Sequence, residues 1–127
     1  MGAIRADDLA TYTAFLTNTV TVGGSLVNYK HVLSRASLEE MWTPVVPMTD
    51  GYEAAAGQYM GLSFFLSGTS DHRIIGHTGS QAGFRAFFYF NPNTTAAVIA
   101  VFNTTNAVAP AQAAYRSMHA SAQALIR

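Results

Sequence analysis

The sequence predicts an α+β domain, in which an antiparallel sheet of three to four strands carries a C-terminal helix packed on one face. Three observations support this fold class. Residues 60–66 alternate in side-chain character with a period of two, as a strand does. Two apolar runs, 84–90 and 96–102, are joined by a short turn sequence, and residues 108–125 repeat apolar side chains at steps of three and four. Two earlier helices are expected at the periphery of the sheet.

Those two earlier helices are predicted from apolar periodicity and from capping patterns. Apolar residues share one helical face within 7–17, although no side chain before this segment offers a good N-terminal cap. Ser37 and Glu40 form a capping-box pattern, and the helix that follows should end before Pro44. The remaining segments of this half of the chain are predicted to be loops: 20–34 and 45–57.

The strands are predicted in the second half of the chain. The turn between the last two contains Pro92, in a position suited to a type I turn. These two strands are apolar on both sides, so both faces of the sheet should be covered. The C-terminal helix can cover one face, and cover for the other is not evident in the sequence. The predicted strands are 60–66, 73–77, 84–90 and 96–102, and the predicted helical stripe is Val108, Ala111, Tyr115, Met118, Ala122 and Leu125.

Composition excludes several classes of function. Half of the 127 residues are hydrophobic and 11% are charged, with a net charge of zero, so the chain has no electrostatic footprint for nucleic acid or for an anionic membrane. Cysteine is absent, and no histidine spacing fits a metal site. We therefore predict no metal and no cofactor. Residues 1–8 contain no apolar core of a signal peptide, and no apolar run is long enough to span a bilayer.

The strongest chemical motif is the run Gly-His-Thr-Gly-Ser-Gln-Ala-Gly-Phe-Arg at residues 76–85, which lies between two predicted strands. This run resembles the third conserved element, Lys-Thr-Gly or His-Thr-Gly, of the serine β-lactamase and DD-peptidase superfamily. The His form is similar to that of DD-peptidases, D-amino-acid peptidases and related esterases. Further segments follow the family's order over essentially the whole chain: 6–9, 38–44, 61–62, 91–92 and 103–104.

The resemblance implies a role for each residue of the motif. His77 and Thr78 would bind the polar end of the substrate, and Gly79 would let the substrate approach the backbone because it has no Cβ. The backbone N–H of Ser80 would be one of two oxyanion donors, the other belonging to the nucleophile. The substrate would be an ester, a D-amino-acid peptide or a β-lactam, and His in place of Lys favours an esterase or peptidase.

The family's nucleophile motif, Ser-x-x-Lys, is absent. Lys30 is the single lysine, and Val27 lies three residues before it. The family's second motif, Tyr-x-Asn, has a literal match at residues 89–91, but after the third motif instead of before it, and we interpret this match as turn chemistry. We therefore expect residues 1–127 to be a single partial domain, the C-terminal part of a β-lactamase/transpeptidase-like fold, inactive alone.

Two classes of function follow. The first is a segment of an acyl-transferring serine hydrolase that acts on a small-molecule or peptide substrate together with the missing N-terminal portion. The second is a non-catalytic binding or interaction domain, or a degenerate fragment. In either case an unpaired apolar edge at residues 96–102 predicts self-association or a partner chain. The family resemblance is compatible with a periplasmic or secreted location, which the sequence leaves open.

Other polar residues have simpler interpretations than a role in chemistry. His31, His72 and His119 are interpreted as surface or structural residues. Arg85 interrupts an apolar strand, and we expect its side chain to reach solvent in preference to lining a site.

Overall fold

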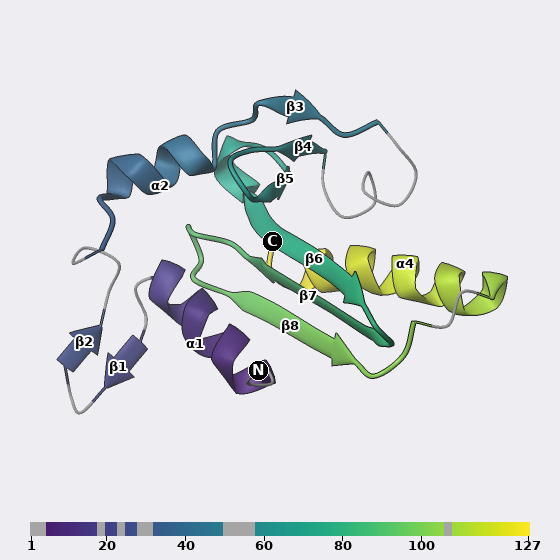
Figure 1. Ribbon diagram of the computed structural model, residues 1–127. Helices are drawn as coiled ribbons and strands as arrows, with labels where there is room; N and C mark the ends of the chain where they lie inside the picture. The colour runs from purple at the N-terminus through teal and green to yellow at the C-terminus, as the bar shows by residue number, and fades with distance from the viewer. Residues whose placement is uncertain (1–4, 18–19, 23–24, 28–31, 50–57, 106–107) are drawn as a thin grey trace.

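The structure is a computed structural model that describes residues 5–17, 20–22, 25–27, 32–49, 58–105 and 108–127. Six strands form one antiparallel sheet in the order β3-β4-β5-β6-β7-β8, so each strand lies beside its neighbour in sequence (Figure 1). A separate two-stranded hairpin precedes them. The strands are β1 (Val20–Val22), β2 (Ser25–Val27), β3 (Val46–Pro47), β4 (Tyr59–Met60), β5 (Phe65–Ser67), β6 (Ile74–Gln81), β7 (Phe84–Phe90) and β8 (Ala97–Phe102).

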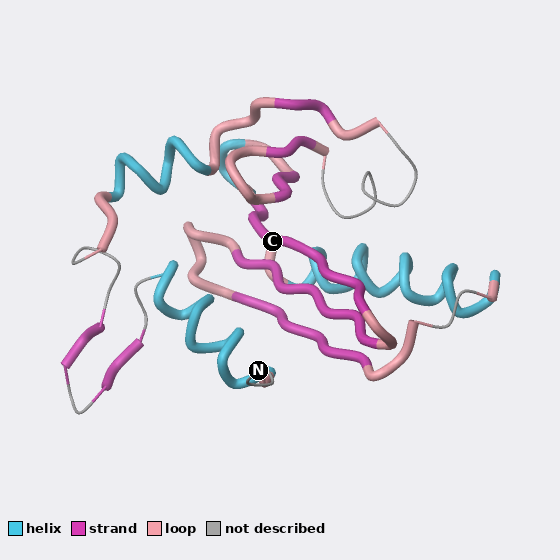
Figure 2. The backbone as a smooth tube through the Cα atoms, in the orientation of Figure 1, coloured by secondary structure: helices cyan, strands magenta, loops and turns pink. Residues whose placement is uncertain are grey.

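Three α-helices accompany the sheet in the described part of the chain. α1 (Ala6–Thr17) packs against β7 and β8, and α4 (Ala109–Leu125) lies across the opposite face of the same strands (Figures 1 and 2). α2 (Arg35–Met41) lies near the short strands, and a single 3-10 turn, η2 (Ser70–His72), precedes β6. None of the described helices combines the length and apolar character that a bilayer crossing requires.

Each face of the sheet has its own hydrophobic core. α1 and α2 cover one face, where the buried residues are Leu16, Leu38, Trp42, Phe64, Leu66, Ile75 and Phe90. α4 covers the other face, where they are Ile74, Phe87, Tyr89, Tyr115, Ala122 and Ile126. The α+β class and the packing of the C-terminal helix are therefore confirmed. The chain also covers both faces of its apolar strands, so the earlier helices are part of the core and not peripheral to it.

The sheet has more strands than the predicted three to four, because the alternating segment 60–66 is not one strand. β4 ends at Met60, and a tight turn reverses the chain before β5 begins at Phe65. The Gly61 N–H donates to the Phe64 carbonyl at 2.8 Å, and Ser63 lies in the left-handed region with φ of 64°. Alternation of side chains continued through the turn, so the sequence pattern did not reveal it.

Two predicted loops also contain strands. The segment 20–34 holds β1 and β2, which pair antiparallel from Val20 opposite Val27 to Val22 opposite Ser25. Within 45–57, the strand β3 pairs with β4, and residues 50–57 lie outside the described residues. Strands of two or three residues are too short to produce a readable period.

Both early helices begin with hydrogen bonds that the sequence patterns did not predict. The Asp8 carboxylate, in the first turn of α1, accepts a hydrogen bond from the backbone N–H of Arg5 at 2.8 Å. A residue within the helix therefore caps its N-terminus. For α2 the capping residue is Ser34, whose hydroxyl accepts the N–H of Ser37 at 3.0 Å. The predicted cap at Ser37 was therefore three residues late, and Glu40 is not part of a capping box.

The buried stripe of α4 is rotated from the predicted one. Tyr115 and Ala122 are buried as expected, but Met118 is 40% exposed and Leu125 is 79% exposed. His119 and Gln123 are buried in their place. The Tyr89 hydroxyl lies 2.6 Å from His119 Nδ1, and the hydroxyl of Ser67 donates to Gln123 at 3.0 Å. The sheet thus supplies the polar partners that allow these two residues to be buried.

The Tyr-x-Asn match at residues 89–91 has a structural role. Asn91 Oδ1 accepts the N–H groups of Asn93 and Thr94, at 2.9 Å and 3.3 Å, and its amide donates to the Ile126 carbonyl at 3.0 Å. Asn91 therefore forms the turn between β7 and β8 and ties it to the end of α4. Tyr89 points to the α4 side, so its interpretation as part of the fold is confirmed.

Candidate active-site strand

The His-Thr-Gly-Ser motif lies within a continuous strand. We predicted a short strand that ends at His77, but β6 continues to Gln81 and pairs with β7 over its whole second half. Residues 77–81 are paired with β7, opposite apolar residues except at Ser80, which is opposite Arg85. This pairing, not their own strand propensity, holds them extended.

A two-residue turn fixes the register of this pairing. Ala82 and Gly83 have φ values of 49° and 88°, which is the signature of a type I′ hairpin. In such a turn the flanking residues, Gln81 and Phe84, form a hydrogen-bonded pair. Hydrogen-bonded and non-hydrogen-bonded pairs alternate along an antiparallel ladder. Thr78 and Ser80 are therefore in non-hydrogen-bonded pairs, and their backbone N–H and C=O groups point away from β7.

These backbone groups point to an open edge. On that side of β6, β5 pairs only with Ile74 to Gly76, where Gly76 is opposite Phe65. Among the described residues, no strand pairs with the segment from His77 to Gln81 on that edge. The backbone donors of Thr78 and Ser80 are therefore presented to whatever lies beside the strand.

The imidazole of His77 is held over this same edge. Its ring stacks on the ring of Phe65 with centroids 4.5 Å apart, and Nδ1 lies 2.6 Å from the carbonyl oxygen of Thr78. Because a carbonyl can only accept, Nδ1 carries the proton and donates it. In the neutral ring the lone pair is then on Nε2, which can accept a hydrogen bond or a proton.

Gly79 is an open point of the motif. A Cβ built at Gly79 would meet no atom within 4 Å, whereas one at Gly76 would lie 2.1 Å from the backbone oxygen of Phe88. The two glycines of this strand therefore have different reasons to be glycine. Gly76 makes room for β7, and the space beside Gly79 is available to a ligand.

Side chains of the motif alternate between the two faces of the sheet. His77 and Gly79 share the face with Phe88, which α1 covers, while Thr78 and Ser80 share the other face with Phe87. What these residues have in common is the open edge. The sequence pattern alone did not reveal Phe65 as the support of the imidazole, because the two residues are twelve positions apart with no recurring spacing.

Arg85 does not reach solvent as predicted. Its guanidinium lies 4.8 Å from the centre of the Tyr115 ring, and Nη1 is 3.4 Å from Gln112 Oε1. The side chain is half-buried on the α4 face, because the aromatic ring attracts its cation. The sequence alone does not indicate this contact.

The other histidines are where a structural interpretation expects them. His72 is exposed and His119 is buried, and His31 lies outside the described residues. In the described part of the chain, no cluster of three or more metal-ligating side chains is found. The site is therefore a strand edge with two backbone donors, one imidazole and one open glycine.

Comparison with known proteins identifies the family. Searches of curated proteins and of solved structures gave no match. The sequence model of the beta-lactamase family, in contrast, matches residues 3–123, which is nearly the whole chain. Together with a His-Thr-Gly-Ser segment on an open sheet edge, this match means that the chain belongs to the beta-lactamase family, a family of serine hydrolases.

Proposed function

We propose that this chain carries the substrate-binding strand of an acyl-transferring serine hydrolase that acts on an ester, a D-amino-acid peptide or a β-lactam. The observation that supports the proposal best is the open edge of β6, where the N–H of Ser80 points outward beside Gly79. An acyl group in that position can place its carbonyl oxygen against a backbone donor, which is how an oxyanion is stabilised in acyl transfer.

Each residue of the motif then has a role that its geometry allows. Ser80 contributes its backbone N–H as the oxyanion donor, and its side chain is not required. Gly79 admits the substrate to the backbone. His77 and Thr78 bind the polar end of the substrate, with the Nε2 of His77 as the acceptor, because its Nδ1 is held by the Thr78 carbonyl.

The nucleophile has to come from a Ser-x-x-Lys motif, which these 127 residues do not contain. We propose that another part of the enzyme supplies it, so the chain alone binds substrate without cleaving it. Acyl transfer needs the attacking oxygen, a base beside it and the oxyanion donors together. Of these groups, the chain contributes one of the two oxyanion donors, the backbone N–H of Ser80.

Substitution of Ser80 tests the proposed oxyanion donor. Ser80→Pro removes the N–H, and because this N–H is not used in the ladder with β7, the hairpin should persist. Ser80→Ala is the matched control, since it removes the side chain and keeps the donor. Binding of benzylpenicillin, N-acetyl-D-Ala-D-Ala and phenyl acetate is followed by the backbone amide resonances of residues 77–81.

At least one of the three probes should shift those resonances in the native chain and in Ser80→Ala. Ser80→Pro should weaken its binding about tenfold, the usual effect of one lost hydrogen bond. Equal binding by both variants, or no shift with any probe, would contradict the proposal. A folded Ser80→Pro variant, checked by its circular dichroism, is required for the comparison.

Gly79→Ala provides a second test on the same strand. A Cβ at this position meets no protein atom, so the variant should fold as stably as the native chain. Its methyl group enters the space that the substrate is proposed to use, so binding should fall. Unchanged binding would place the ligand elsewhere.

The chemical step is tested by intact mass after incubation with a fluorophosphonate, a serine-directed probe. We expect no adduct, because none of the serines has the lysine partner of the family motif. A stoichiometric adduct on one serine would contradict the proposed division of roles and would identify a nucleophile within the chain.

A non-catalytic binding domain is the second candidate function, and the same open edge supports it. Both candidates predict that the chain binds ligand, but only the hydrolase candidate predicts substrate cleavage once a Ser-x-x-Lys segment is supplied.

We also propose that the chain pairs through β8, whose outer edge has no strand partner among the described residues and whose Val101 is 46% exposed. The occupant is a second copy or a partner chain.

A further inference from the structure

The molecule has a cavity that is separate from the β6 edge. It has a volume of about 300 Å³, at the lower end of the range for small-molecule pockets. Arg73, at its wall, is four positions before His77, which corresponds to about 13 Å along an extended chain. Its lining residues come from the end of α2, from β4 and from β5 with its following turn: Trp42, Thr43, Pro44, Tyr59, Leu66, Ser67, Gly68, Thr69 and Arg73.

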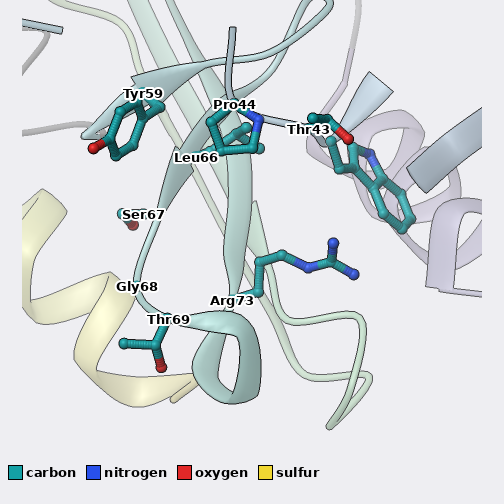
Figure 3. A pocket seen from close by; sticks show the side chains of 9 residues that line it. Thr43, Pro44, Tyr59, Leu66, Ser67, Gly68, Thr69 and Arg73 are labelled. Carbon is teal, nitrogen blue, oxygen red and sulfur yellow. The ribbon is translucent and has the colours of Figure 1, made fainter. Parts of the chain in front are cut away.

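The lining combines an apolar surface with hydroxyl groups and one cation. Figure 3 shows Tyr59 and Pro44 at one end of this group and Thr69 and Arg73 at the other. The indole of Trp42 is 1% exposed, so it forms part of the buried wall. A ligand in this cavity would meet aromatic and aliphatic carbon on one side and polar atoms on the other.

Two donors in this wall have no acceptor among the described residues. They are the Nε1–H of Trp42 and the Nε–H of Arg73, both buried. Neither side chain has any atom that can accept, so only an acceptor can satisfy them. Buried donors in folded proteins nearly always have an acceptor. Two donors without one at the same cavity are therefore a reason to expect a ligand or solvent acceptor there.

The charge around the indole favours an anion over a neutral acceptor. Arg73 and Arg35 both lie over the Trp42 ring, at 5.7 Å and 5.2 Å from its centre. Glu39 is the carboxylate that bridges them, accepting from Arg73 Nη1 at 2.7 Å and also pairing with Arg35. The two guanidinium groups and the carboxylate that bridges them carry a combined charge of about +1.

From these observations we propose that the cavity bounded by Trp42 and Arg73 binds a small organic carboxylate with an apolar body. The apolar part would pack against Pro44, Leu66 and the ring of Tyr59, and the carboxylate would be oriented to the side of Arg73 and Trp42. Binding requires a small adjustment of the wall, since both donor atoms are covered. This site is independent of the proposed acyl-transfer function.

The chain has its own reporter for this site, because Trp42 is its single tryptophan. The indole Nε1–H therefore gives one resolved resonance in a ¹⁵N-correlated spectrum. Benzoate is the probe, and benzamide is its neutral counterpart of the same shape. We expect a saturable shift of the indole resonance with benzoate and at least about tenfold weaker binding of benzamide, as expected for the loss of a charge-assisted contact.

Variants separate this proposal from the alternatives. Arg73→Gln should abolish the preference for benzoate. Thr69→Leu should reduce binding of both probes by filling the cavity, and this hydroxyl makes no capping bond to η2 that its loss would break. Arg85→Gln is the matched control, because Arg85 is also half-buried over an aromatic ring but lies on the α4 face. His77→Ala should leave the benzoate titration unchanged.

Two results would overturn the proposal. One is the absence of a saturable indole shift with benzoate in the folded native chain. The other is equal affinity for benzoate and benzamide, which would mean that the cavity does not recognise charge. If Arg73→Gln does not fold, the Thr69→Leu variant and the benzamide comparison still decide the question, since neither changes the ion pairs.

Discussion

The buried pair of His119 and Tyr89 predicts that the fold loses stability when the pH falls from neutral to mildly acidic values. His119 is 0% exposed, between the rings of Phe87 and Tyr115, and its Nδ1 lies 2.6 Å from the Tyr89 hydroxyl. Burial lowers the pKa of His119 from 6.5 to about 4. Burial also raises the pKa of Tyr89, so its hydroxyl keeps its proton and donates to the neutral imidazole.

The sign and size of the effect follow from linkage. The imidazole binds a proton more readily in the unfolded chain than in the folded one, so stability is complete above about pH 6.5 and falls as the pH drops towards 4. Between about pH 7.5 and about pH 5, this one group lowers the free energy of unfolding by about 2 kcal/mol. That is a large part of the margin of a small domain.

The assay is urea unfolding, followed by the fluorescence of Trp42, at several pH values in this range. Glu39 does not interfere, because the hydrogen bond from Arg73 lowers its pKa and its contribution is lost only below its ordinary value of 4.5. His119→Gln removes the titrating group and should flatten the dependence, while His72→Gln, at an exposed position, should not. A native chain whose unfolding free energy is constant from about pH 7.5 to 5 would refute the reasoning.

Three further predictions concern backbone and edge positions. Gly76→Ala should destabilise the fold by about 2 kcal/mol, measured by urea unfolding, because its Cβ would lie 2.1 Å from the Phe88 oxygen and 2.4 Å from the Tyr89 ring. Ala82→Asn should raise stability by roughly 0.5–1 kcal/mol, measured as thermal midpoint, since Asn tolerates the left-handed conformation that Ala82 adopts. Val101→Lys should shift any self-association towards monomer in sedimentation experiments, because a charge on the edge opposes strand pairing.

The sequence predicted best those elements whose signal was long and local. β7, β8 and α4 were predicted close to their observed limits, because two long and mainly apolar strands and a helical repeat of seventeen residues are readable from the local sequence. The α+β class followed from these three elements. The order of the sheet then needed only that consecutive strands pair, which is the usual outcome.

The sequence-based predictions were wrong where contacts with residues distant in sequence determine the local structure. His119 and Gln123 were not part of the predicted apolar stripe of the C-terminal helix, but Tyr89 and Ser67 supply their hydrogen bonds from the sheet. The second half of β6 reads as a loop on its own, and it is extended because β7 holds it. For the candidate site, the sequence identified the motif residues but could not show that Thr78 and Ser80 point to an open edge, since that depends on register.

The open edges of β6 and β8 differ in a way that bears on function. The exposed half of β6 is polar, with a histidine, a threonine, a serine and a glutamine around Gly79, so water can satisfy its outward groups when no ligand is bound. The edge of β8 consists only of apolar side chains, so its outward backbone groups are flanked by surface that water solvates poorly. The first edge is therefore suited to reversible binding, and the second to a lasting partner. A variant that abolishes pairing at β8 should leave ligand binding at β6 intact, since β7 lies between the two edges and fixes the register of both.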